Sequence, residues 1–421
     1  MKQSELFTKT RREAPSDEAS KNAKLLIRGG FIHKEMSGVY SLLPLGLIVM
    51  EKIANVVREE MKNIGGQEVR LSAMQSRELW EKTDRWDDKK VDIWFKSDIK
   101  NGAQIGLGFT HEEPLTAIMR EHVSSYKDLP KYIFQIQTKF RNEERAKSGI
   151  LRGREFLMKD FYSFSRNEEE HKEFYEKAAK SYGRIFNRVG IGECTFRTFA
   201  SGGVFSKFSD EFQTLSEVGE DVIFLDEKNK TAINSEVFTD ETLSDLGKQK
   251  GDFVEKKSIE VGNIFSLGSR FSEPLGLKFK NENGAENVVI MGSYGIGIGR
   301  LMGTVAEILS DGLGLVWPKE ISPFDLHLVS IGAEKSAKVK KQADELYEGL
   351  LENGVDVLYD DRDLRAGEKF ADSDLLGIPT RVVISEKTMG DGKVEVKERI
   401  KKEALYMTEK ELLETPHYRT C

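Results

Sequence analysis

Phe140-Arg-Asn-Glu-Glu-Arg-Ala-Lys-Ser-Gly-Ile-Leu-Arg-Gly-Arg-Glu-Phe156 is an arginine-rich polar stretch between two apolar segments that have the character of strands. From Lys139 to Arg154 the chain has six Lys or Arg and two Glu, a local charge of +4 in a protein whose net charge is −7. Such a concentration of positive charge requires an anionic ligand or buried acidic partners. We therefore expect a strand, an anion-binding loop and a second strand, with a solvated basic loop as the alternative.

A second glycine-rich segment ends in an arginine and runs into a helical pattern, Met291-Gly-Ser-Tyr-Gly-Ile-Gly-Ile-Gly-Arg-Leu-Met-Gly303. Glycines let a backbone approach a ligand, and arginine offers a planar, permanently charged fork to phosphate oxygens. Two such segments suggest a nucleotide. A dinucleotide-binding loop would need a third glycine where Met302 stands, and the phosphate-binding loop ending in Gly-Lys-Ser/Thr is absent. A different kind of nucleotide site is therefore expected.

These segments resemble the signature motifs of class II aminoacyl-tRNA synthetases. Residues 141–143 together with residues 152–156 are similar to motif 2, and residues 295–300 are similar to motif 3. Upstream, Gly38-Val-Tyr-Ser-Leu-Leu-Pro-Leu-Gly46 and the helical pattern after it are similar to motif 1. The three motifs together indicate the family more strongly than any one of them.

Three further segments narrow the resemblance to bacterial-type prolyl-tRNA synthetases, namely residues 109–113, 135–141 and 155–160. Matching segments extend from about residue 6 to residue 391. The resemblance implies ATP-dependent attachment of L-proline to its tRNA. In the first step prolyl-adenylate forms and pyrophosphate is released, and in the second the prolyl group passes to the terminal adenosine of the tRNA.

The length of 421 residues exceeds what one hydrophobic core usually organises, so at least two domains are expected. The resemblance implies an α+β catalytic domain over residues 1–320, with an antiparallel sheet flanked by helices. From residue 321 to residue 421 a strand, helix, strand order predicts a small α/β domain with a mixed sheet. This part resembles the anticodon-binding domain of the prolyl, threonyl, histidyl and glycyl enzymes. In this scheme the three motifs occupy about residues 38–74, 135–164 and 291–307.

Residues 46–63 have the apolar spacing of a helix, and residues 67–74 are expected to form a strand. By resemblance this pair builds a homodimer interface, although an ordinary core helix and strand would have the same periodicity. Residues 226–258 are polar and stand where many bacterial prolyl enzymes carry a large hydrolytic editing domain. Roughly thirty residues are too few for such a domain. Editing of misactivated alanine within this chain is therefore predicted to be missing.

Composition is that of a soluble globular protein, with 38% hydrophobic and 32% charged residues. A cytoplasmic location without membrane contact is expected, because the chain has no run of 18 apolar residues and no signal-peptide core after Met1. Cys194, Cys421 and six scattered histidines make no zinc pattern, so no protein-bound metal is predicted. The net charge neither excludes nor supports tRNA, which is implied by the resemblance alone.

Activation joins the proline carboxylate to the α-phosphate of ATP. Because that carboxylate is already ionised at neutral pH, no general base is needed. The protein must instead hold two anions together and stabilise the charge that develops on phosphorus. By resemblance, the catalytic residues are Arg141, which reaches the α-phosphate and the carboxylate, and Arg300, which holds the γ-phosphate.

The resemblance assigns further ATP contacts to Glu143, which would accept a hydrogen bond from the adenine amino group, and to Arg152, Gly153 and Gln213. Mg²⁺ should accompany ATP as a phosphate-bound ion, with no dedicated protein cage visible in the sequence. Its protein ligands stay unassigned.

Thr110 and Glu112 are expected to bind the secondary ammonium of proline. Its two N–H hydrogens need two acceptors, and a hydroxyl and a carboxylate two residues apart on one strand would supply them. Met158 is expected to line the pocket of the pyrrolidine ring, with plain core packing as the alternative. Alanine should also enter this pocket, because missing methylenes give only about 1–3 kcal/mol of discrimination.

Arg362, Arg365 and Lys369 are the side chains that we place nearest the RNA, although a solvated helix end would explain them almost as well. The chain departs from the family at Gly202-Gly-Val-Phe-Ser-Lys-Phe-Ser-Asp-Glu-Phe212. Bacterial relatives usually have Gly-Gly-Ser-x-Ser-His-Glu-Phe there, and Asp210 takes the place of the histidine. Contacts to proline from residues 200–208 therefore stay open.

Two other functions are compatible with the same motifs. A relative could activate a small amino acid for a carrier other than tRNA, which the apparent anticodon domain counts against. A non-catalytic binding subunit should have lost Arg141, Glu143 or Arg300, and all three are present. A threonyl enzyme would need a Cys/His zinc site, and a seryl enzyme a long N-terminal heptad arm. Neither pattern is found.

Overall fold

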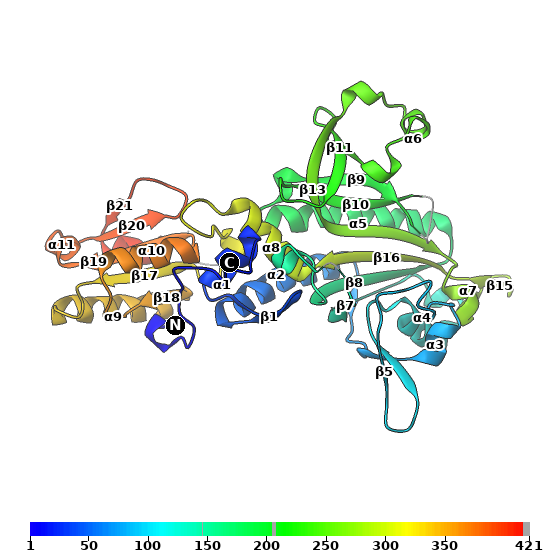
Figure 1. The fold of residues 1–421 in the computed structure, drawn as a ribbon, viewed down its shortest axis with the longest axis horizontal. Helices are drawn as coiled ribbons and strands as arrows, with labels where there is room; N and C mark the ends of the chain where they lie inside the picture. Colours follow the sequence, from blue (N-terminus) through cyan, green and yellow to red (C-terminus); the bar gives the residue numbers. More distant parts are fainter. Residues whose placement is uncertain (145, 204–207, 416–421) are drawn as a thin grey trace.

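The structure is a computed structural model and describes residues 1–144, 146–203 and 208–415. Within these residues the largest element is a nine-stranded sheet in the order β10-β9-β12-β11-β13-β16-β8-β7-β3 (Figure 1). Neighbouring strands are antiparallel except for the pairs β9–β12 and β3–β7. The strands are β10 (Phe208–Leu215), β9 (Thr195–Ser201), β12 (Thr231–Asn234), β11 (Asp221–Asp226), β13 (Val254–Gly268), β16 (Ile290–Gly297), β8 (Glu155–Ser165), β7 (Lys131–Phe140) and β3 (Gln67–Glu68).

The two segments that the sequence singled out lie side by side in this sheet. β7 and β8 pair along their whole length up to Phe140 and Glu155, so the arginine-rich residues form the loop between them. β16 pairs with the other edge of β8, where Gly297 is opposite Met158, and helix α8 (Ile298–Leu309) follows directly. The predicted strand-loop-strand and the predicted strand that runs into a helix are both confirmed.

Helices α2, α5 and α8 belong to the core beside this sheet. Helix α5 (Glu168–Arg188) packs on β8, β13 and β16 and is capped by Asn167, whose Oδ1 accepts from Glu170 N at 2.9 Å. Helix α2 (Pro44–Asn63) begins with proline at its first position, as helices tolerate, and packs on α5 and α8. A Cβ on Gly46 would lie 2.0 Å from the Phe31 carbonyl oxygen, so this close approach requires glycine.

The strand predicted over residues 67–74 is wrong as a continuous element. Its start is β3, which pairs with β7, whereas its end belongs to β4 (Met74–Ser76), which pairs with β6 (Gln104–Leu107) in a separate sheet. The chain leaves one sheet for the other between the two. This smaller three-stranded sheet, completed by β5 (Phe95–Asp98), lies beside helices α3 (Arg77–Glu81) and α4 (Glu112–His122).

The C-terminal part is a five-stranded mixed sheet in the order β18-β17-β19-β20-β21. β17 is parallel to β18 and β19, and the remaining pairs are antiparallel, which confirms the predicted mixed sheet. Residues at the N-terminus also reach this sheet, since Lys2 bridges to Tyr359. The elements are β17 (Leu326–Ile331), α9 (Ala337–Glu352), β18 (Val357–Asp360), α10 (Ala366–Leu376), β19 (Thr380–Ser385), α11 (Glu386–Gly390), β20 (Val394–Glu398), β21 (Leu405–Met407) and α12 (Glu409–Glu414).

The polar segment at 226–258 forms a compact projection from the large sheet, at the top of Figure 1. It contains β12, helix α6 (Asp240–Asp245) and the start of β13, and the rings of Phe224 and Phe238 stack at 3.7 Å. The long strand β13 pairs with both β10 and β11, so its first residues are joined to the large sheet by strand pairing. The segment is therefore part of the main sheet. The remaining elements are α1 (Lys21–Arg28), β1 (Ile32–Met36), β2 (Val39–Leu42), α7 (Ser272–Leu275), β14 (Lys278–Lys280) and β15 (Glu286–Val288).

Candidate active site

A cavity of about 310 Å³ opens where the loop after β7 meets β8, β13, β16 and the start of α8. It contains most of the predicted ATP contacts and one predicted proline contact. The predicted residues on its wall are Arg141, Glu143, Arg152, Gly153, Met158 and Arg300. Of the side chains that the sequence did not single out, Phe156, Glu220, Asp221, Glu260 and Asn263 also line it.

Arg141 lies on the cavity wall, and its side chain has no polar partner in the part of the chain that the structure describes. Its backbone N–H donates to Arg154 O at 2.8 Å, which closes the base of the loop, and its guanidinium lies 5.1 Å from the centre of the Phe156 ring. The buried Nε has no hydrogen-bond partner among the described residues. Burial, and then the positive charge of Arg300, lower the pKa of Arg141. A desolvated, unpaired cation of this kind is stabilised when an anion enters the cavity.

Arg300, in contrast, is held firmly. Its Nε donates to Leu151 O at 2.9 Å, and its Nη1 donates to Glu260 O at 2.9 Å and to Glu260 Oε2 at 3.2 Å. The glycines before it keep the cavity open, since a Cβ on Gly295 would lie 2.6 Å from Asn263 Oδ1 and from Met158 Cε. The position of Arg300 in the cavity is therefore fixed by hydrogen bonds to two separate segments, at Leu151 and at Glu260 on β13.

Arg152 and Glu143 are joined to each other across the loop. The Arg152 guanidinium lies 3.1 Å from Glu143 and 3.0 Å from Glu220, which is in the turn between β10 and β11. Glu220 has no recognisable pattern in the sequence, because it reaches the loop from a turn far along the chain. In this structure two acidic residues thus balance the charge of Arg152 at the edge of the cavity.

Gln213 lies behind the cavity wall. It is fully buried on β10, and its Nε2 donates to Glu211 Oε2 at 2.9 Å and to Asp221 Oδ2 at 3.0 Å. Burial, and then the charge of Glu260, raise the pKa of Glu211 to about 7. Gln213 therefore holds two carboxyl groups next to the cavity, and a direct contact to ATP stays a prediction.

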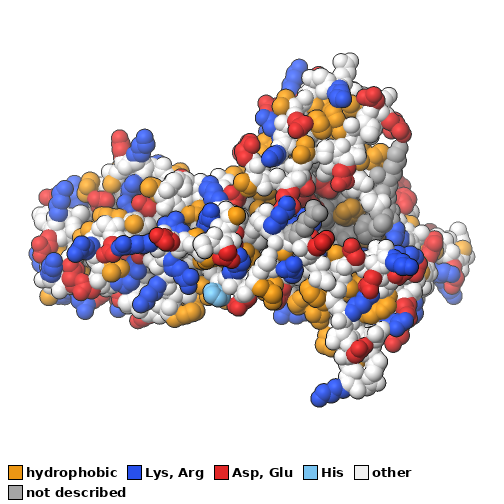
Figure 2. Space-filling view, in the orientation of Figure 1, with side chains coloured by type: hydrophobic (Ala, Val, Ile, Leu, Met, Phe, Trp, Pro, Cys, Tyr) orange, Lys and Arg blue, Asp and Glu red, His pale blue; other side chains and the backbone are white. Residues whose placement is uncertain are grey.

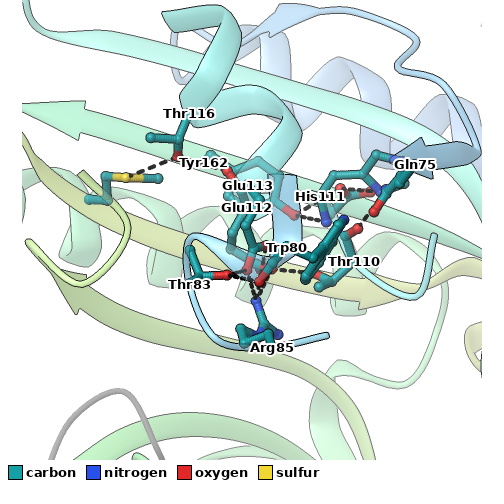
Figure 3. A network of polar contacts seen from close by, with 12 residues as sticks. Gln75, Trp80, Thr83, Arg85, Thr110, His111, Glu112, Glu113, Thr116 and Tyr162 are labelled. Atoms are coloured by element: carbon teal, nitrogen blue, oxygen red, sulfur yellow. Dashed lines mark hydrogen bonds and ion pairs between the residues drawn. The ribbon is translucent and has the colours of Figure 1, made fainter. Parts of the chain in front are cut away.

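Thr110 and Glu112 belong to a second polar group beside the cavity, drawn in Figure 3. The prediction that they share a strand is wrong: Thr110 lies in the connection after β6, and Glu112 is the first residue of α4. Pro114 explains the difference, because proline fits the first turn of a helix. Thr110 Oγ1 donates to Glu112 Oε2 at 2.6 Å, so the two side chains still face each other.

A fully buried network lies next to this pair. Lys139 Nζ is 2.7 Å from Asp160 Oδ1 and 2.7 Å from His111 Nδ1, and Gln135 Nε2 donates to Asp160 Oδ2 at 2.9 Å. His111 Nε2 lies 3.0 Å from Ser72 O and therefore carries a proton, while Nδ1 accepts from the Lys139 ammonium, so the ring is neutral. Burial, and then the charge of Lys139, lower the pKa of His111 to about 4.

Two neutral, buried histidines give the protein a defined acid sensitivity. Burial lowers the pKa of His327 to about 4 as well, and its Nε2 lies 3.1 Å from Gln3 Oε1. The unfolded chain binds a proton at each histidine near pH 6.5, whereas the folded chain does so only near pH 4. We therefore expect the free energy of unfolding to fall as the pH is lowered from about 6.5 to about 4.

Denaturant unfolding of the His327→Gln variant across this range tests the expectation. The variant should lose less stability between pH 6.5 and pH 4 than the wild-type protein does. His122→Gln, at an exposed position, is the control and should follow the wild-type curve. A His327→Gln curve parallel to that of the wild type would contradict the assignment.

The three residues predicted to lie near RNA have different positions. Arg365 is exposed at the start of α10, and Arg362 is partly exposed and paired with Asp360 at 2.7 Å. Lys369 is fully buried, with its Nζ donating to Ser330 O at 2.7 Å and to Asp360 O at 3.1 Å, so an RNA contact by Lys369 is wrong. The helical period turns it toward the sheet. Basic and acidic side chains are interspersed on this end of the molecule in Figure 2.

The departure around residues 200–208 is only partly visible, because residues 204–207 lie outside the described part of the chain. Asp210, which takes the place of the family histidine, is on β10. Its Oδ2 accepts from Tyr175 OH at 2.8 Å and from Arg197 Nη2 at 2.7 Å. Asp210 is thus part of a polar cluster between α5 and β9.

Residues 94–309 match the family described as tRNA synthetase class II core domain (G, H, P, S and T), and residues 326–415 match the anticodon binding domain. The proline--tRNA ligase of Bartonella quintana (strain Toulouse) is 36% identical over 424 residues, which cover 95% of this chain and 96% of that protein. The chain belongs to the proline--tRNA ligase family. The proline--tRNA ligase of Geobacillus sp. (strain WCH70) is 32% identical over 566 positions, covering 99% of each chain. That family member is therefore longer, and the present chain lacks a large insertion.

Solved structures of the family share the fold. The prolyl-tRNA synthetase of Cryptosporidium parvum, complexed with L-proline and AMP, superposes with a TM-score of 0.75, covering 93% of this chain and 73% of that chain. The Giardia lamblia enzyme in complex with prolyl-adenylate gives 0.76, with 93% and 75% covered. Both are 18% identical to this chain, so this likeness concerns the fold alone.

Proposed function

We propose that this chain activates L-proline with ATP and transfers it to tRNA, as a proline--tRNA ligase. The observation that carries the proposal is Arg141, a partly buried cation whose buried Nε has no polar partner among the described residues, in one cavity with Arg300. The positive charge of Arg300 lowers the pKa of Arg141 after burial does, and the negative charges of a nucleoside triphosphate and a carboxylate would offset both positive charges.

Arg141 is the residue that bridges the two reactants. The α-phosphate and the proline carboxylate are both anions and repel each other, so a fixed cation between them lowers the cost of bringing them into line. Its ring contact with Phe156 and its position at the base of the loop hold it in place before the reaction. The charge that develops on phosphorus then meets a preorganised donor. Arg300, fixed by Leu151 and Glu260, holds the far phosphate.

The remaining contacts divide between nucleotide and amino acid. Glu143 and Gly153 contact the adenine. Arg152 leaves its ion pairs with Glu143 and Glu220 and binds the nucleotide instead. Thr110 and Glu112 bind the proline ammonium, and Met158 packs against the ring. Burial and Arg300 lower the pKa of Arg141, and the charge of Glu112 opposes this lowering, which supports one continuous site for both ends of proline.

Mg²⁺ bound to ATP would neutralise charge at the phosphates. Within residues 1–144, 146–203 and 208–415 no group of three or more His, Cys, Asp or Glu side chains is arranged to hold a metal by itself. The carboxylates of Asp221 and Glu260 line the cavity and fit an ion that is held mainly by phosphate oxygens. Zinc has no role in this proposal.

The partners are tRNA, which the domain at 321–421 binds through Arg362 and Arg365, and a second copy of the chain. Exposed apolar side chains near the motif 1 region support a homodimer: Met36, Leu42, Leu47 and Met74. We also propose that the border between the two domains lies between residues 320 and 321, and that the protein is located in the cytoplasm. In the described residues no helix has the length and apolar character that crossing a membrane requires.

Proline-dependent exchange between ATP and pyrophosphate on the purified chain tests the proposal. We expect exchange to be strongest with proline and weaker, but measurable, with alanine, because a pocket discriminates missing methylenes by only about 1–3 kcal/mol. Cysteine and threonine are run in parallel. Charging of a proline tRNA transcript then tests the second step.

The outcomes separate the alternatives. Exchange that is strongest with another amino acid would contradict proline as the substrate. Exchange without tRNA charging would favour a different carrier. A folded protein with no exchange for any amino acid would favour a binding subunit, in which the two arginines have a structural role.

A further inference from the structure

Arg85 lies at the lower edge of the polar group in Figure 3 and has no role in the mechanism above. It lies in the connection after α3, and its Nη1 is 3.0 Å from Glu113 Oε1, 3.1 Å from Glu113 Oε2 and 3.4 Å from Glu112 Oε2. One nitrogen therefore contacts two consecutive carboxylates at the start of α4. All three side chains are buried.

Aromatic rings hold the guanidinium in a fixed position. Its central carbon lies 5.1 Å from the ring centre of Trp80, 5.2 Å from that of Phe109 and 5.3 Å from that of Phe271. A planar guanidinium stacks on such rings and keeps its donors pointing in one direction, which a flexible ammonium does not do. Arg85 is thus a rigid support rather than a mobile surface charge.

The charges of this group leave one negative charge uncompensated. Arg85 is one cation between two carboxylates, and Glu113 also accepts from Thr83 Oγ1 at 2.8 Å. Glu113 is fully enclosed, and burial raises its pKa. The contact of Glu112 with Arg85 is longer than that of Glu113, and Glu112 also accepts a hydrogen bond from Thr110. The negative charge of Glu112 also acts on Arg141 in the cavity. The position of Glu112 therefore suits a ligand cation as its second partner.

We propose that Arg85 is a positioning residue for recognition of the substrate ammonium. It neutralises Glu113 and holds Glu112 in the orientation in which the Glu112 carboxylate accepts from the secondary ammonium of the amino acid. The inference rests on the proposed function, since it takes Glu112 as the acceptor. It concerns selection of the ammonium group and leaves activation of the carboxylate to Arg141.

Two carboxylic acids distinguish recognition of the ammonium from binding of the carboxylate. Proline has a ring ammonium, whereas tetrahydro-2-furoic acid has the same ring size and carboxylate with an ether oxygen in its place. In Arg85→Met we expect the KM for proline in pyrophosphate exchange to rise by about 10- to 100-fold, the scale of one lost hydrogen bond to a charged group. The inhibition constant of tetrahydro-2-furoic acid, the KM for ATP and kcat should each change by less than about threefold, because Arg85 supports binding of the ammonium alone.

Arg85→Lys retains the charge but loses the planar fork, and should recover part of the proline KM. Arg77→Met is the matched control, since Arg77 lies in α3 and pairs with Glu81 at an exposed position. It should leave every constant unchanged. If Arg85→Met does not fold, as judged by its melting temperature, the Arg85→Lys constants decide the test alone.

Equal losses for proline and for tetrahydro-2-furoic acid, or an unchanged proline KM in both Arg85 variants, would overturn the inference while wild-type exchange still supports the function. Absence of proline-dependent exchange in the wild-type protein would overturn both.

Discussion

The Arg141→Ala variant should catalyse proline-dependent pyrophosphate exchange about 10²- to 10³-fold more slowly than the wild-type protein, the scale of losing one preorganised contact to the transition state. The loss should appear in kcat as well as in kcat/KM, because Arg141 meets charge that grows as the reaction proceeds. Single-turnover formation of the adenylate measures this step directly.

Stability distinguishes this role from that of a structural salt bridge. The Arg141 side chain has no hydrogen bond or ion pair to the described residues, so its removal takes away a desolvated charge and breaks no polar contact. The melting temperature of Arg141→Ala should therefore equal or exceed that of the wild type. Arg166→Ala is the control, since Arg166 follows β8 and pairs with Glu170 at 2.6 Å away from the cavity. An Arg141→Ala protein that is destabilised but retains its exchange rate would contradict the catalytic role.

The Asp160→Asn variant should be destabilised by about 3–5 kcal/mol, because removing one partner of a buried ion pair leaves the other charge uncompensated. Lys139 would then be a buried ammonium with His111 as its main remaining polar contact. The free energy of unfolding, measured with denaturant at neutral pH, tests the expectation. Activity should fall as well, since this network supports β7 and β8 immediately before Arg141.

A second substitution shows whether charge is the cause. Lys139→Met in the Asp160→Asn background removes the uncompensated ammonium and should recover part of the lost stability. Glu81→Gln, which breaks the exposed pair with Arg77, should cost at most about 1 kcal/mol. A cost for Asp160→Asn as small as that of Glu81→Gln would show that the pair contributes little.

Local patterns sufficed for the elements that carry the site. β7, the arginine-rich loop and β8 follow from an apolar, polar, apolar order that only a strand-loop-strand satisfies, and the glycine-rich segment before Arg300 follows from the need for close backbone approach. The C-terminal mixed sheet likewise follows from its alternation of strands and helices. In each case the type of element depends on residues that are close together in the sequence.

Contacts between distant segments could not be predicted in this way. Lys369 was placed at the RNA by its charge, and only packing of α10 on the sheet shows that it is buried against Asp360. The strand predicted for Thr110 and Glu112 is wrong, because Glu112 begins helix α4, and their role in binding the proline ammonium stays a prediction. Glu220 and Arg85 carry no local signal, since each meets its partners across the fold.

The sequence by itself determined the family, the strand-loop-strand around Arg141 and the mixed sheet of the C-terminal part, because those properties depend on residue type and spacing along the chain. The tertiary structure decided which charges remain unpaired. The Arg141 side chain has no polar partner among the described residues. Arg152, Lys139 and Arg85 are each paired with a carboxylate, because folding brings a Glu or Asp from elsewhere in the chain next to them. Because charge interactions act through space and depend on burial, only the folded chain fixes them.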